Sequence, residues 1–171
     1  MKKDLAIILG LFLLIAVILV FGSSFSTTGF LKSTTATSAA VFKDDVTVPV
    51  VIGDLKINAK VASSANTRKK GLSKKSSIPL DSGMIFAFET QDKYGIWMKD
   101  MKFAIDILWV DNHKNIVAIA AEVPPQPGKG DKELTVYKPS VDSLYVLEIN
   151  AGLSKLYNIN VGDKVIFETP K

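Results

Sequence analysis

The sequence predicts a mainly β domain of the jelly-roll or β-sandwich type with two short helices, preceded by an N-terminal transmembrane helix. Short runs of β-branched and aromatic residues recur between Gly, Pro, Asn and Asp turns over residues 44–171, which is typical of such folds. Only two short segments of that region have a helical pattern. Residues 5–22 carry no charge and would form roughly 27 Å of helix, close to the roughly 30 Å hydrocarbon core of a membrane.

Residues 1–22 are therefore expected to be a membrane anchor or an export signal. Lys2 and Lys3 precede the apolar run, so the positive-inside rule places the N-terminus in the cytoplasm and the domain outside it. The run exceeds the apolar core of about 7–15 residues that a cleaved signal has, and this favours an uncleaved anchor. If the segment is cleaved instead, the domain is secreted.

A flexible tether is expected over residues 23–43. Residues 23–40 are rich in Ser, Thr, Ala and Gly and carry a single charge, Lys32. Such a composition buries too little apolar surface to offset the entropy of ordering. The folded domain is expected over residues 44–171.

The first elements of the domain follow from alternation and turn residues. Residues 46–52 and 55–61 predict a hairpin around Gly53-Asp54. A short helical turn is expected at residues 68–70, capped by Asn66 or Thr67.

The remaining elements are mostly strands. Strands are expected at residues 84–88, 94–98, 105–110, 116–122, 144–149 and 164–167. Residues 124–132 carry three prolines and two glycines and predict a loop. A short helix is expected at residues 150–157, with Asn150 as its N-cap.

Composition excludes several classes of site. The chain has no cysteine, which removes disulfides, thiolate metal sites and thiol nucleophiles. Its net charge is +4, but Arg68 is the only arginine among 21 basic residues and the lysines are scattered. Nucleic-acid surfaces concentrate basic residues and favour arginine, so no nucleic-acid partner is expected.

A series of short motifs runs through the domain in order. The motifs are Arg68, Gly71-Leu72, Gly83-Met84-Ile85-Phe86, Trp97-Met98-Lys99, Ile105-Asp106-Ile107, Val146-Leu147-Glu148, Ala151-Gly152 and Val161-Gly162-Asp163-Lys164-Val165. Over residues 56–167 this series resembles the family DUF192. The resemblance implies a compact, jelly-roll-like β fold, often found behind an export signal, and no established activity. Asp100-Met101 departs from the Asn-Thr pair that is usual in the family.

Asp106 is the sharpest candidate for a site residue, because it interrupts an otherwise apolar strand. A buried carboxylate needs a partner, and Arg68 and Lys99 are the natural ones. The residue has two interpretations: a structural carboxylate, held by an ion pair or by loop N–H groups, or a ligand-binding or catalytic group.

Trp97, Lys99, Arg68 and Asp100 complete the candidate binding site. Trp97 is either core filling or an aromatic wall for a flat ligand. Arg68 either pins a loop or binds an anion through both of its terminal nitrogens. His113, the only histidine, lies in a polar turn, so no metal and no cofactor are expected.

Three functions are compatible with these residues. The first is a membrane-tethered, extracytoplasmic module that binds a small molecule or an envelope polymer. The second is a hydrolase of cell-envelope carbohydrate that uses Asp100 and Asp106 as an acid–base pair. The third is a structural partner in an envelope complex, for which an exposed apolar patch or sheet edge is expected.

Overall fold

The computed structural model describes residues 43–168. The membrane segment predicted for residues 1–22 and nearly all of the predicted tether lie outside these residues. Within residues 43–168, no helix has the length and apolar character that a membrane crossing requires.

The described residues form a mainly β domain with two short helices, as the sequence predicts. In chain order the elements are β1 (Thr47–Ile52), β2 (Leu55–Ala62), α2 (Ala65–Lys70), β3 (Ser82–Asp92), β4 (Ile96–Trp97), β5 (Ile105–Val110), β6 (Ile116–Val123), β7 (Val136–Tyr137), β8 (Ser143–Asn150), α3 (Leu153–Leu156) and β9 (Val165–Phe167). Strand β5 has the bounds that the apolar run predicts, whereas β7 is a strand of two residues that was not expected from the sequence.

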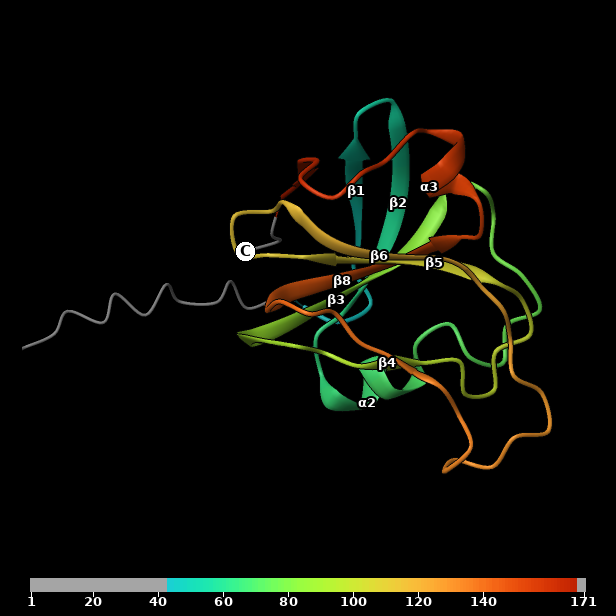
Figure 1. The fold of residues 1–171 in the computed structure, drawn as a ribbon. Coiled ribbons are helices and arrows are strands. Elements are labelled where there is room, and N and C mark those ends of the chain that lie inside the picture. The colour runs from blue at the N-terminus through green and yellow to red at the C-terminus, as the bar shows by residue number, and fades with distance from the viewer. Residues whose placement is uncertain (1–42, 169–171) are drawn as a thin grey trace, which may run out of the picture. The chain divides into compact units, whose positions relative to one another are not determined.

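Seven strands form one sheet in the order β6-β5-β8-β3-β2-β1-β9, and β4 pairs with β7 in a separate two-stranded ribbon. The neighbours in the large sheet are antiparallel except for β2 and β3, which are parallel. The sheet is strongly curled, since β1 and β2 stand upright in Figure 1 while β3, β8, β5 and β6 run across the view.

The predicted jelly-roll or sandwich arrangement is therefore wrong in its topology. Alternation of apolar and polar residues determines which face each side chain takes, but it does not choose the neighbouring strand. The chain leaves β2, passes through α2 and returns as β3 beside β2 and parallel to it, which requires a crossover. One curled mixed sheet results in place of two packed antiparallel sheets.

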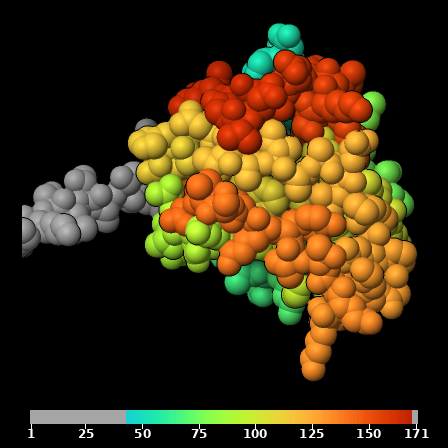
Figure 2. Space-filling model, viewed as in Figure 1, coloured from blue at the N-terminus to red at the C-terminus, as the bar shows by residue number. Residues whose placement is uncertain are grey.

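Both faces of the sheet are covered. On β5, Leu108 and Val110 belong to one buried cluster, while Ile107 and Trp109 belong to another on the opposite face. Every residue of β5 is buried. In Figure 2 the segment after β6 (orange) spreads over the lower part of the visible face, and the segment after β8 (red) covers the top.

The central strands β3 and β8 approach closely at Gly83. A Cβ atom at this position would lie 2.6 Å from the backbone oxygen of Glu148 and 3.1 Å from the Ile57 side chain. Such contacts are shorter than real Cβ atoms make, so only glycine fits between these neighbours.

Helix α2 begins one turn earlier than the sequence predicts. Ser64, and not Asn66 or Thr67, is the N-cap, and its hydroxyl accepts a hydrogen bond from the Thr67 N–H at 3.2 Å. The Asp44 carboxylate accepts bonds from the N–H groups of Ser63 at 2.6 Å and Ser64 at 3.0 Å. The start of the described chain is thereby joined to the start of α2.

Helix α3 is capped by a residue from a distant strand. Its N-cap is Gly152, which has no side chain, and the predicted cap Asn150 instead donates to the Pro79 oxygen at 2.8 Å. The fully buried Asp106 supplies the missing acceptors. Its carboxylate accepts from the Gly152 N–H at 3.0 Å, and from the Ser154 N–H at 2.8 Å and Ser154 hydroxyl at 2.7 Å.

A fourth bond reaches Asp106 from strand β6. The Glu122 N–H donates to it at 2.7 Å, at the point where the β5–β6 register shifts. Glu122 has a positive φ of 50°, and its N–H lies within the register shift. Asp106 is therefore a structural carboxylate that accepts N–H bonds, which is one of the two structural roles expected from the sequence. Neither Arg68 nor Lys99 is its partner.

Replacing Asp106 by Asn tests this role. An amide has one oxygen where the carboxylate has two, and its NH₂ group would face N–H donors. We expect Asp106→Asn to lower the free energy of unfolding by about 2–4 kcal/mol in urea denaturation. The exposed Asp81→Asn is the control and should change stability by less than about 0.5 kcal/mol. A stability equal to that of the wild type would contradict the capping role.

Candidate functional site

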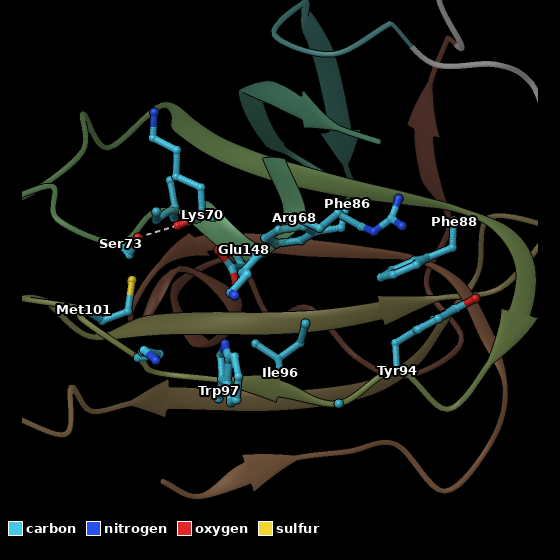
Figure 3. Close-up of a pocket in the computed structure, with 15 residues that line it drawn as sticks. Arg68, Lys70, Ser73, Phe86, Phe88, Tyr94, Ile96, Trp97, Met101 and Glu148 are labelled. Carbon is cyan, nitrogen blue, oxygen red and sulfur yellow. Dashed lines mark hydrogen bonds between the residues drawn. The ribbon is translucent and has the colours of Figure 1, made fainter. Parts of the chain in front are cut away.

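A pocket of about 230 Å³ opens where α2 and the following turn face β3, β4 and β8. Figure 3 shows its walls, with residues of α2 and β3 on one side and those of β4 on the other. It is lined by Arg68, Lys69, Lys70, Gly71, Leu72, Ser73, Phe86, Phe88, Tyr94, Gly95, Ile96, Trp97, Lys99, Met101 and Glu148. Most of these lie between Gly71 and Met101 in the sequence.

Glu148 is the polar residue at the base of this pocket. It lies in β8 between Met84 of β3 and Ile107 of β5, its partners in register. Its side chain shares a sheet face with Val146, opposite to the face of Leu147 and Ile149. Glu148 is only 5% exposed, and no residue within 43–168 donates a hydrogen bond to its buried Oε2.

Burial determines the protonation state of Glu148. Removal from water disfavours the charged form and raises the pKa of this carboxyl to about 8. At neutral pH the group is therefore mostly a neutral acid, which offers one O–H donor. It can donate a hydrogen bond to a ligand, or exchange a proton with one, in a largely apolar setting.

Aromatic rings form one side of the pocket. Phe88 and Tyr94 stack with their centroids 3.4 Å apart and their planes 8° apart. The Arg68 guanidinium lies over the Phe88 ring, 4.7 Å from its centroid. It also donates to the backbone oxygens of Ala87, at 3.0 Å, and Ser63. Arg68 is thus fixed beside Phe88, and Figure 3 shows its guanidinium pointing away from Glu148.

Trp97 and Lys99 form the open edge of the pocket. Trp97 is 39% exposed, so its indole is a wall and not core filling. The Lys99 ammonium lies 5.7 Å from the centroid of the indole. The same ammonium pairs with Asp131, at 2.6 Å from the carboxylate oxygen. This pair connects the pocket edge to the long loop between β6 and β7.

The structure brings together three of the five residues predicted from sequence. Arg68, Trp97 and Lys99 line the pocket, but Asp100 and Asp106 do not. Asp100 is exposed and borders a smaller hollow of about 90 Å³ with Lys99, while its backbone oxygen accepts from the Lys74 N–H at 3.1 Å. Asp106 is fully buried in the α3 cap.

Sequence reasoning missed Glu148 as a site residue. The signal was present, since Glu148 interrupts the apolar run of residues 144–149 as Asp106 interrupts its own strand. Phe86, a residue of the Gly83-Met84-Ile85-Phe86 motif, is both buried and part of the pocket wall.

The described residues offer no evident metal site. Within 43–168, no group of three or more His, Asp or Glu side chains is placed to hold a metal ion. The pocket itself presents one carboxyl group and several cations, a set that does not attract a metal cation.

The raised pKa of Glu148 predicts how the stability of the protein depends on pH. The unfolded chain releases the Glu148 proton near pH 4.5, whereas the folded chain keeps it until about pH 8. The folded state binds more protons between these values, so stability falls as pH rises through this window and is then constant. We expect the titration of Glu148 to lower the free energy of unfolding by about 3–5 kcal/mol across this pH window.

Glu148→Gln should abolish that part of the pH dependence, because the amide does not titrate. Urea unfolding of both proteins at about pH 5 and about pH 8 measures the difference. Glu89→Gln, an exposed change in β3, should keep the wild-type slope. An undiminished slope in Glu148→Gln would show that Glu148 ionises normally.

Comparisons with known proteins agree on the fold and leave the activity open. A Sinorhizobium meliloti protein described as a candidate transcription regulator is 22% identical, with a TM-score of 0.65 over 73% of this chain and 96% of its own. A Novosphingobium aromaticivorans protein of unknown function is 28% identical, with a TM-score of 0.62 over 78% of this chain and 98% of its own. No curated protein matches. The profile of DUF192, described as an uncharacterised ACR, matches residues 48–167, and the chain belongs to this family.

Proposed function

We propose that this protein is a binding module that holds a small ligand with a flat apolar body in the pocket above Glu148. The observation that carries the proposal is the buried Oε2 atom of Glu148, which has no hydrogen-bond partner among residues 43–168. Leaving a buried polar atom unpaired costs about 1–3 kcal/mol, and native proteins keep few such atoms. A ligand that pairs with this atom would recover that cost.

The lining supports a flat ligand. Trp97 offers an exposed ring at the entrance, and Phe86, Leu72 and Met101 offer buried apolar surface deeper in the pocket. Ligand sites are characteristically apolar clefts with a few placed polar groups. With about 230 Å³, the pocket is smaller than the roughly 300–1,000 Å³ of drug-sized sites, so a single ring suits it.

The hydrolase alternative has less support. Glycoside hydrolysis needs two carboxyl groups on either side of the scissile bond. Asp106 has both oxygens occupied by hydrogen bonds, and Asp100 lies outside the pocket. Glu148 is the one carboxyl group among the described residues that line the pocket, so binding is the function we favour.

We also propose that the domain works outside the cytoplasm, on a membrane tether. The support is the uncharged run of residues 5–22 and the Lys2–Lys3 pair before it. A ligand would then reach the pocket from the extracytoplasmic side, as a free small molecule or as part of an envelope polymer.

A ligand screen with matched variants tests the binding proposal. Single-ring acids, amides and amines, together with monosaccharides, are screened by NMR chemical-shift changes. For a compound that binds, Trp97→Ala should weaken affinity by about tenfold, because the aromatic wall at the entrance is lost. Tyr157→Ala is the control, since Tyr157 is 41% exposed and lies outside the pocket. No binding compound, or equal weakening by both variants, would refute the proposal.

Protease protection tests the tether. In right-side-out membrane vesicles, added protease should cut within residues 23–43 and release the domain, whereas inverted vesicles should protect it. Removal of residues 1–22 should leave the domain in the soluble cytoplasmic fraction. Protection in right-side-out vesicles with digestion in inverted ones would reverse the proposed orientation.

A further inference from the structure

The charges around the pocket have one sign except at its base. The described cationic residues that line it are Arg68, Lys69, Lys70 and Lys99, and Figure 3 shows the Lys70 side chain extending away from Glu148. Arg68 donates to backbone oxygens and lies over Phe88. Lys99 forms an ion pair with Asp131. Lys69 and Lys70 are exposed in the last turn of α2, and neither forms an ion pair within the described part of the chain. The entrance therefore presents positive charge that is not locally neutralised.

Glu148 adds no effective negative charge to this site near neutral pH. Its neighbours in register, Met84 and Ile107, are apolar, and no salt bridge reaches it from residues 43–168. The other titratable groups around the pocket are Arg68, Lys69, Lys70, Tyr94 and Lys99. A neutral carboxyl donates its proton to an acceptor, so a ligand is recognised there through an oxygen or nitrogen lone pair.

We propose that the ligand is a single-ring organic anion, with an acceptor atom on Glu148 and its negative charge in the positive field of Lys69 and Lys70 at the entrance. The inference rests on the proposed binding function and narrows it to one chemical class. Three features of the pocket act together: a donor at the base, ring-sized apolar walls between, and cations at the entrance. A cationic ligand meets like charge at the entrance and a neutral acid at the base, so it is disfavoured.

Three compounds of one shape test the class. 4-Methoxybenzoate, 4-methoxybenzamide and 4-methoxybenzylamine share a ring and an acceptor oxygen and differ in charge. At pH near 6.5 and constant ionic strength, the wild-type protein should bind the benzoate about tenfold more tightly than the amine, with the amide between them. Affinities are measured by NMR titration or calorimetry.

Two variants separate the contributions of the base and the entrance. The double change Lys69→Ser and Lys70→Ser should weaken the benzoate about threefold or more and leave the amide unchanged, whereas Lys155→Ser in α3 should affect neither. Between about pH 6.5 and 8.5, wild-type affinity for the benzoate should fall about fourfold as Glu148 ionises. Glu148→Gln should bind at both pH values alike, because its amide N–H also donates.

The outcomes distinguish this inference from the proposed function. Tightest binding of the amine, or an unchanged benzoate affinity in the double lysine variant, would overturn the anionic class while leaving a binding pocket. Binding of other single-ring compounds, but none of these three at millimolar concentration, would also overturn it. If no compound of the wider screen binds, the proposed function fails as well.

Discussion

The position of helix α3 and the end of the sheet both depend on the hydrogen bonds that the Asp106 carboxylate accepts. A buried charge is tolerated only when its lone pairs are filled, and here each carboxylate oxygen receives two donors. One donor is the N–H of Glu122 at the register shift between β5 and β6, and the others begin α3. A helix of four residues cannot stabilise itself, so its position follows from this contact and from its apolar burial.

Glu148 occupies the neighbouring strand and has the opposite character. Asp106 pairs with Ile149 across the β5–β8 ladder and Glu148 pairs with Ile107, so the two acids lie close in register but on opposite faces. One face supplies N–H groups from the register shift of β6 and from the start of α3. The other supplies apolar side chains and an opening. A carboxyl side chain is thus a structural hydrogen-bond acceptor on one face, at Asp106, and a donor without a partner among the described residues on the other, at Glu148. Only the surroundings distinguish the two.

Local patterns predicted most of the strands, because residues such as those at 105–110 are apolar on both faces and bounded by turn residues. The parallel pairing of β2 and β3 was not predictable, since pairing depends on the path of the whole chain. For the site, Trp97 and Lys99 were found because an aromatic and a cation two residues apart are a local signal. The partners of Asp106 were not found, because they are 16 to 48 residues away and three of the four donors are backbone N–H groups, which any sequence has. Glu148 carried the same signal as Asp106, and only the fold shows which of the two faces an opening.

Gly83 connects the architecture to the chemistry of the pocket. This glycine is not part of the pocket wall, yet the backbone oxygen of Glu148 lies only 2.6 Å from the position that its Cβ would take. The depth at which the Glu148 carboxyl sits is therefore determined by the spacing of two backbones, and not by the residues that would touch a ligand. Side chains of the pocket wall could therefore change without moving this carboxyl, provided that a glycine remains where β3 and β8 meet. Gly83 thus helps to set the acidity of Glu148 from outside the pocket.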